Sequence, residues 1–187
     1  MELALYGGAF DPPHNAHEKI VNYCYEKYDL IVLMPSGKTV GKEFDVSIRH
    51  RLKMLDIISM GYDNKLIIDN YEIGNKSYSY TINTIRYLEK KYNNYRINMI
   101  IGSDQLLNFS SWKDNREIIK KVNIVCINRP NSDVDIEVDS VRYIDEINLD
   151  ISSSLIKKQL QSKLSLDSSK INPKILNYIH KNKLYNS

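Results

Sequence analysis

Two histidines, His14 and His17, lie three residues apart in the stretch GGAFDPPHNAH, which covers residues 7–17 and follows a short apolar run. If a helix begins near His14, side chains at this spacing share one face, so both imidazole rings can point at one ligand. Imidazoles donate hydrogen bonds to phosphate oxygens and can carry positive charge near pH 7. The pair could also bind a metal ion, but the sequence offers no third ligand nearby. We therefore expect a phosphate site and no metal held by the protein.

The residues before the histidines suit the same chemistry. Gly7 and Gly8 let the backbone turn sharply and approach a ligand without a Cβ atom in the way. The helix that follows is expected to offer unpaired N–H groups and the positive end of its dipole to an anion. Phe10 is large enough to anchor the loop in the core, and Asp11 can tie the turn by accepting hydrogen bonds from backbone amides. We interpret the loop as a phosphate clamp.

A run of three serines far along the chain is a second candidate anion site. Ser152, Ser153 and Ser154 open a predicted helix over residues 151–160, and their amides and hydroxyls could hold phosphates. Lys157 follows Ser154 by three residues and shares its face, where a cation would meet a polyphosphate. Taken alone, the run is better explained as simple helix capping.

The elements that must position these residues follow from the hydrophobic pattern. Strand-like apolar runs alternate with longer helical patterns, which predicts an α/β fold with a doubly wound, Rossmann-like parallel sheet. We expect one domain over residues 1–187, with a small C-terminal helical part from about residue 151. The predicted strands are 3–6, 30–35, 65–69, 97–104, 122–130 and 141–145. The predicted helices are one from about residue 15, then 47–60, 79–92, 114–121, 151–160 and 173–181.

Several candidate residues follow predicted strands directly. In doubly wound sheets, ligands bind beyond the carboxyl ends of the strands. The glycine loop, IIGSD at 100–104 and INRP at 127–130 all lie at such ends, and ISSS at 151–154 opens a helix soon after another. We expect these segments to converge on a single cleft.

Composition narrows the function classes. The chain has 187 residues, of which 42% are hydrophobic and 26% charged, and its formal net charge is +3. These values predict a full-sized core, and they argue against a basic stripe for nucleic acid.

Cys24 and Cys126 lie far apart, so neither a disulfide scaffold nor a zinc site is expected. The sequence has no signal-peptide pattern and no apolar run near the roughly 18 residues that a membrane span needs. We expect a cytoplasmic protein without nucleic-acid or membrane partners. Its oligomeric state stays open, a homodimer being one option.

Five stretches resemble motifs of one enzyme family, in the family's order. GGAFDPPHNAH resembles the G-x-F-D-x-x-H-x-G-H signature of the nucleotidyltransferase superfamily, in the GG-x-FDPPH form typical of bacterial nicotinate mononucleotide adenylyltransferases. The others are SYSYTINTI at 77–85, MIIGSDQLLNFSSW at 99–112, IVCINRP at 124–130 and ISSSLIKKQL at 151–160. Together they span nearly the whole chain, so the resemblance concerns more than one loop.

The resemblance implies transfer of the adenylyl group of ATP to nicotinate mononucleotide, giving deamido-NAD and pyrophosphate, with Mg²⁺ arriving mainly on the ATP phosphates. It implies catalytic roles for His14, His17 and Lys157, with His17 stabilising charge on the α-phosphate. The residues that it assigns to ATP are Gly7, Gly8, Ala9, Phe10, Asp11, His14, His17, Ile151, Ser152, Ser153, Ser154 and Lys157. Those that it assigns to the mononucleotide are Tyr80, Thr81, Gly102, Ser103, Asp104, Trp112 and Arg129.

The sequence departs from the family pattern at three places. Ala16 stands where the family usually has glycine, and Lys157 replaces the usual arginine. The stretch PSGKTVGKEFD, at 35–45, lacks the family's PPHK. Nicotinamide mononucleotide, or another phosphorylated acceptor such as pantetheine phosphate, is therefore an alternative substrate, although Trp112 and the SYT helix favour a pyridine ring. An alternative of another class is a non-catalytic nucleotide-binding regulatory protein, which Ala16 and Lys157 would permit.

Overall fold

The computed structural model describes residues 1–38, 43–74, 78–127, 141–145, 147, 151–162 and 167–185. Within them, six strands form one parallel sheet in the order β3-β2-β1-β4-β5-β6. This is the strand order of a doubly wound sheet, so the predicted fold class is confirmed. The strands are β1 (Glu2–Gly8), β2 (Leu30–Pro35), β3 (Leu66–Ile68), β4 (Arg96–Gly102), β5 (Asn123–Ile127) and β6 (Val141–Ile144).

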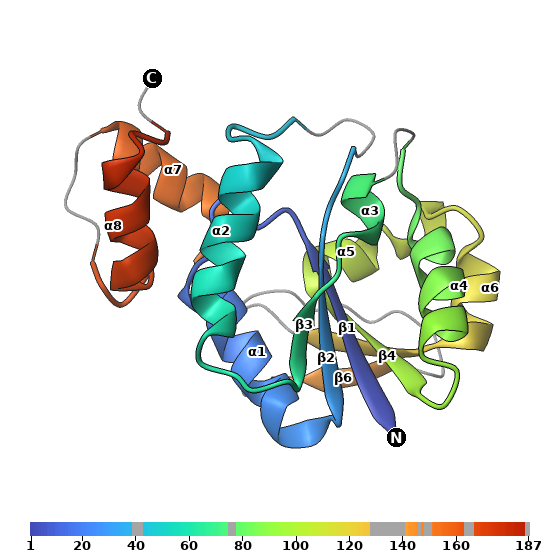
Figure 1. Cartoon of the computed structure of the whole chain (residues 1–187). Coiled ribbons are helices and arrows are strands. Elements are labelled where there is room, and N and C mark those ends of the chain that lie inside the picture. The colour runs from blue at the N-terminus through green and yellow to red at the C-terminus, as the bar shows by residue number, and fades with distance from the viewer. Residues whose placement is uncertain are drawn as a thin grey trace.

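Helices cover both faces of the sheet (Figure 1). They are α1 (Asn15–Lys27), α2 (Ile48–Ser59), α3 (Tyr71–Gly74), α4 (Thr81–Lys91), α5 (Ser103–Leu107), α6 (Asn115–Lys121), α7 (Ser153–Gln161) and α8 (Pro173–Lys181), with a 3-10 turn at Phe109–Ser111. The short helices α3 and α5 and the 3-10 turn were not predicted, because three to five residues are too few to show a helical period. None of the helices in the described ranges is long and apolar enough to cross a membrane.

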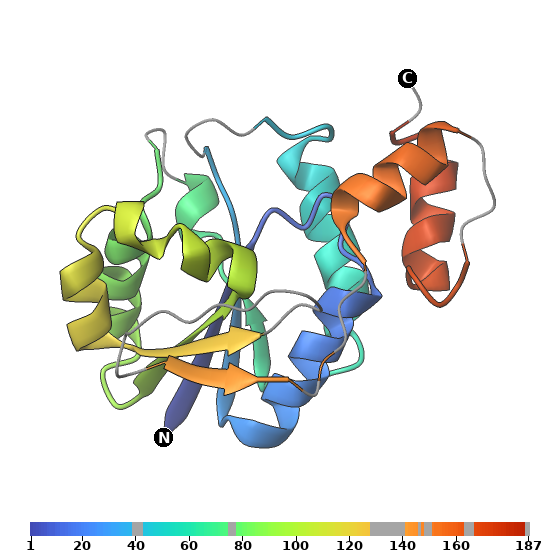
Figure 2. The same cartoon turned by 180° about the vertical axis from the view of Figure 1, so that it is seen from behind.

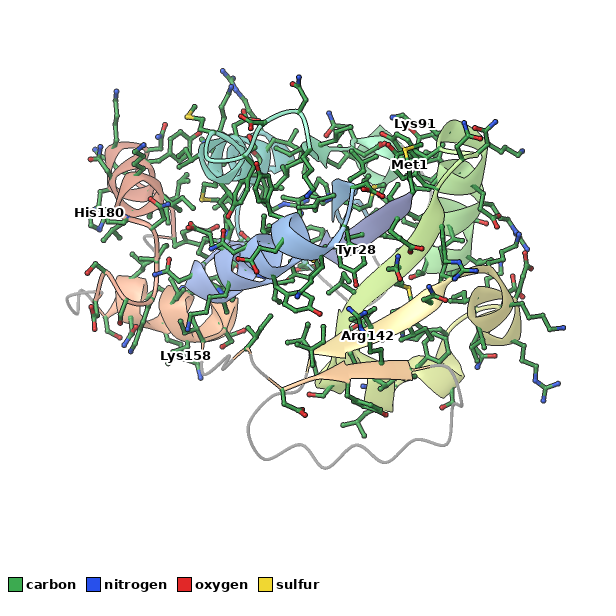
Figure 3. All side chains as sticks on the ribbon, turned by 90° about the horizontal axis from the view of Figure 1, so that it is seen from below. Met1, Tyr28, Lys91, Arg142, Lys158 and His180 are labelled. Carbon is green, nitrogen blue, oxygen red and sulfur yellow. The ribbon has the colours of Figure 1, made fainter. Side chains whose placement is uncertain are left out.

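The core has two layers because side chains alternate along each strand. Ala4 and Tyr6 of β1 pack with α1, α2, α7 and α8 on one face. Leu3 and Leu5 pack with α4, α5 and α6 on the other. Figure 3 shows Arg142 of β6 below Tyr28, and its Nη2 atom donates to the Tyr28 hydroxyl at 3.0 Å, which fastens the edge strand to the end of α1.

The helix α2 is rotated relative to the prediction. Its apolar pattern predicts that Ile48 and Leu52 face the core, but both are only half-buried. Arg51 and Met54 are buried in their place, together with Leu55 and Ile58 as expected. The hydrophobic period misplaced the inner face because a charged residue lies on it, and the contacts of that residue are described below.

The C-terminal helices pack against the start of the chain. The Asn15 amide donates to the Lys170 carbonyl at 3.0 Å, and the Asn172 side chain donates to Glu18 at 3.0 Å. Ile175 and Ile179 of α8 join the core layer that contains α1 and α2. Figure 2 shows α7, in orange, beside the loop that joins β1 to α1, so the two candidate anion sites are brought together.

Candidate active site

A cavity of about 680 Å³ lies at the carboxyl ends of β1 and β4. These neighbouring strands mark the point where the strand order reverses, which is where doubly wound sheets bind ligands. The predicted site residues that line the cavity are Gly7, Gly8, Ala9, His14, His17, Tyr80, Thr81, Gly102, Asp104, Trp112 and Ile151. The first, second and third motifs thus share one cavity, as expected, whereas the fifth contributes Ile151 alone. Arg129 of the fourth motif lies outside the described residues.

The two histidine rings lie against each other at the start of α1. Their centroids are 3.7 Å apart with planes inclined by 34°. His14 is the N-cap residue, and its backbone N–H donates to Nδ1 of His17 at 3.1 Å. Because Nδ1 accepts this hydrogen bond, the proton of a neutral His17 ring resides on Nε2, which becomes a donor. Both residues line the cavity, as the three-residue spacing predicts.

Aromatic packing fixes the position of His17. The Phe10 ring lies 5.1 Å from the His17 ring, and Tyr6 lies 6.1 Å away on the same side of the sheet. Phe10 is 1% exposed and has a φ of 49°, so the loop is folded sharply around its anchor. A Cβ atom on Gly8 would approach the Phe10 ring to 3.0 Å, which explains glycine there. A Cβ on Gly7 would come no nearer than 3.9 Å to other protein atoms, so Gly7 leaves room toward the cavity.

The first backbone N–H groups of α1 are less available to bind an anion than the sequence predicts. The Asn15 amide donates to Lys170, and the His17 amide donates to the His14 carbonyl at 2.8 Å. The expectation of unpaired N–H groups is therefore wrong for these two residues, because the C-terminal segment and the capping turn already satisfy them. Ala16, which replaces the family's glycine, is buried and adds its methyl group to the cavity wall.

A buried arginine supports the loop from behind. Arg51 of α2 is 2% exposed, and its Nη1 donates to the carbonyls of Ala9 at 2.8 Å and Ser36 at 3.0 Å. The Phe44 ring lies 3.8 Å from its guanidinium carbon. Burial lowers the pKa of Arg51, but an arginine remains charged throughout the physiological range. The guanidinium therefore joins the ends of β1 and β2 beside the cavity, a role that no pattern in the sequence indicates.

Asp11 does not line the cavity, although the resemblance assigns it to ATP. Its buried carboxylate accepts hydrogen bonds from the Tyr185 hydroxyl at 2.7 Å and from the Asp45 amide at 2.9 Å. Burial and Asp11 raise the pKa of Tyr185, so this hydroxyl keeps its proton and remains a donor. Asp11 does accept a hydrogen bond from a backbone amide, as the sequence suggests, but this amide is that of Asp45, 34 positions along the chain.

Ser152 and Ser153 of the serine run have different structural roles. The Ser152 hydroxyl accepts from the Leu155 amide at 3.2 Å, which is helix capping. The Ser153 hydroxyl donates to the Pro12 carbonyl at 2.9 Å and thereby fastens α7 to the β1–α1 loop. Ser154 is exposed, and Lys157 contacts Asp45. None of these four residues lines the cavity in the described part of the chain, although Ile151 beside them does.

The opposite end of the cavity is formed by α4 and the segment around Trp112. Tyr80 caps α4, and the Lys113 ammonium lies 4.5 Å above its ring. Trp112 is half-buried, with its ring 5.3 Å from that of Phe109. Asp104 and Gly102 line the cavity beside them, whereas Ser103 is buried at the start of α5.

Glu72 of α3 also lines this end of the cavity. The Thr84 hydroxyl donates to its Oε1 at 2.7 Å. Burial raises the pKa of Glu72, and the hydrogen bonds from Thr84 and the Gly37 amide oppose that shift in part. A Cβ on Gly37 would lie 2.1 Å from the Glu72 carbonyl oxygen, so only glycine allows these segments to meet. No periodicity or motif of the sequence distinguishes this glutamate.

Comparisons with known proteins find relatives that match nearly the whole chain. A family model described as cytidylyltransferase-like matches residues 5–159. A protein of Clostridium perfringens named "Probable nicotinate-nucleotide adenylyltransferase" is 31% identical over 201 residues, which covers 98% of each chain. One of the same name from Borrelia turicatae is 31% identical and covers 99% of this chain and 98% of its own. A solved structure, nicotinic acid mononucleotide adenylyltransferase of Plasmodium falciparum complexed with NaAD, superposes with a TM-score of 0.85 at 22% identity and covers 98% of this chain and 97% of its own.

Proposed function

The chain belongs to the cytidylyltransferase-like family, and within it to the nicotinate-nucleotide adenylyltransferases; on this premise we propose that it transfers the adenylyl group of ATP to nicotinate mononucleotide. The products are deamido-NAD and pyrophosphate, a step in the formation of NAD. The observation that supports this most is the single cavity at the reversal of strand order, with paired histidines at one end and Thr81 and Trp112 at the other. Such a cavity can hold two nucleotides with their phosphates facing.

The chemistry is a direct displacement at phosphorus. A phosphate oxygen of the mononucleotide attacks the α-phosphorus of ATP, and the bond from that phosphorus to the oxygen bridging toward the β-phosphate breaks. Negative charge grows on the α-phosphate oxygens, so donors fixed in advance are worth most there. We assign this role to the Nε2 proton of His17, because His14 and Phe10 hold the ring in place. His14 supports the same phosphates from the cap of α1.

The pyrophosphate leaving group is assigned to the start of α7. Ile151 lines the cavity there, and Ser154 is exposed. The Lys157 ammonium lies 4.0 Å from Oδ2 of Asp11 in the β1–α1 loop. An ammonium and the positive end of a nine-residue helix both stabilise a departing anion. Gly7, Gly8 and Ala9 offer backbone contacts to the nucleotides.

The mononucleotide is assigned to the other end. The Trp112 ring can stack on the pyridine, Thr81 can bond its carboxylate, and Asp104 can accept from ribose hydroxyls. Mg²⁺ would reach the cavity on the ATP phosphates, whose charge it neutralises, and Asp104 is the exposed carboxylate in the cavity wall. No group of three or more His, Cys, Asp or Glu side chains in the described ranges could hold a metal ion by itself.

We also propose a cytoplasmic location. The substrates are charged and diffusible. Cys24 and Cys126 are buried and neither is in a disulfide, which accords with a reducing compartment.

An acceptor panel tests the proposed reaction. The purified protein is mixed with ATP, Mg²⁺ and nicotinate mononucleotide, nicotinamide mononucleotide or pantetheine phosphate, and products are identified by chromatography. We expect the highest kcat/KM with nicotinate mononucleotide. A preference for another acceptor would overturn the substrate, and ATP binding without turnover of any acceptor would favour the regulatory alternative.

A further inference from the structure

Lys157 is held by two carboxylates beside the cavity. Its ammonium contacts Oδ2 of Asp45 directly and lies 4.0 Å from Oδ2 of Asp11. The Lys157 side chain is 23% exposed, so this contact lies at the edge of the protein surface and not in its core. Lys157, which we assign to the polyphosphate of ATP, is therefore already paired with negatively charged groups.

The two carboxylates differ in their freedom to move. The Asp11 side chain is 4% exposed, and both its oxygens are engaged, one by Tyr185 and one by the Asp45 amide. The Asp45 side chain is 45% exposed. Asp45 is therefore bound to Asp11 through its backbone, while its carboxylate stays at the surface and contacts Lys157.

We propose that Asp45 is a positioning residue that competes with the polyphosphate of ATP for Lys157 and thereby sets the affinity for ATP. This inference rests on the proposed function, because it requires that Lys157 bind phosphates. Asp11 keeps the ammonium beside the β1–α1 loop, and ATP draws it away from Asp45. A polyphosphate carries several charges and the Asp45 pair is partly solvated, so the competition weakens binding without preventing it.

The substitution Asp45→Asn separates this role from a structural one. It removes the charge but keeps the shape of the side chain and the backbone amide that donates to Asp11. Exposed ion pairs are weak, so we expect ATP to bind about two- to fivefold more tightly at low ionic strength. The gain should shrink in about 0.5 M salt, where charges are screened.

Asp56→Asn is the matched control. Asp56 of α2 also pairs with a lysine, Lys53, and its side chain is likewise 45% exposed. The substitution changes the net charge by the same amount away from the cavity, and we expect no change in ATP affinity. In a Lys157→Met background, Asp45→Asn should also bring no gain, because the cation for which Asp45 competes is gone.

Calorimetric titration with Mg-ATP in the absence of acceptor measures these affinities without turnover. Steady-state kinetics should show a lower KM for ATP in Asp45→Asn and an unchanged KM for the mononucleotide. An affinity for ATP that is unchanged, weaker or equal to that of Asp56→Asn overturns the inference, as does a gain that survives Lys157→Met. Failure of the wild-type protein to bind ATP would overturn the proposed function itself, and the inference with it.

Discussion

The end of the cavity formed by the β1–α1 loop is held by buried side chains. At the end formed by α4 and Trp112, the side chains assigned to the acceptor (Thr81, Asp104 and Trp112) are partly or fully exposed. Phe10, Asp11 and Arg51 are all less than 4% exposed and fix the loop that carries the histidines. Tyr80 is 37% exposed, and Lys113 lies over its ring at the surface. Stabilising a transition state requires groups fixed in advance, while binding an acceptor does not. We therefore expect kcat to depend on the first end and the KM for the acceptor on the second.

The largest effect should come from His17. His17→Ala removes the donor assigned to the α-phosphate, so kcat should fall by at least about 100-fold. His180→Ala, on the exposed face of α8, is the control and should retain full turnover. Circular dichroism establishes that both variants are folded. A His17→Ala variant with near-normal kcat would remove the histidine from the mechanism.

The second largest effect is expected from a substitution of Arg51, which should lower the stability of the folded protein. Arg51→Met leaves the partly buried carbonyls of Ala9 and Ser36 without their donor, and we expect a loss of about 2–3 kcal/mol in the free energy of unfolding. Urea denaturation measures this loss. The KM for ATP should rise more than the KM for the mononucleotide, since the loop that moves carries the histidines. An equal rise in both values would show that the two ends are not separate.

The acceptor end should respond more mildly. Trp112→Leu removes the ring proposed to stack on the pyridine, so the KM for the mononucleotide should rise by about tenfold with little change in kcat. Trp112 is the sole tryptophan of the chain, so the fluorescence of the wild-type protein reports on it alone. The emission should change when the mononucleotide is added. A signal that stays constant at saturating ligand would place the pyridine elsewhere.

The smallest effect should be a pH dependence from Glu72. Burial raises the pKa of Glu72 in the folded protein above the ordinary value for a glutamate, about 4.3. Between these two pKa values the folded protein keeps the carboxyl proton that the unfolded chain has lost. This contribution to stability is complete at lower pH and is lost as the pH rises through the raised pKa. Glu72→Gln has no proton to lose, so its Tm relative to wild type should increase with pH over that window. A constant difference in Tm would mean that Glu72 titrates normally.

The sequence predicted the sheet and the loop because both depend on local patterns. Continuous apolar runs such as 30–35 are typical of buried parallel strands, and β2 has these bounds. The spacing of His14 and His17 predicted their common face for the same reason. The five motifs also indicated the family, because they occur in the family's order over nearly the whole chain.

The support behind the loop could not be predicted, because it depends on contacts between distant segments. Arg51 is buried only because α2 passes beside the carbonyls of Ala9 and Ser36. Tyr185 reaches Asp11 across 174 positions of sequence. A single sequence assigns charged and hydroxyl side chains to the surface, so it gives no sign that these residues lie inside.

The proposed reaction requires that one cavity bring ATP and nicotinate mononucleotide together for direct transfer. A single-turnover experiment with excess protein and ATP labelled at the α-phosphorus tests it most directly. We expect the label to pass from ATP to deamido-NAD, pyrophosphate to appear in equal amount, and no label to become attached to the protein. Labelled protein, or loss of ATP without the dinucleotide, would contradict it.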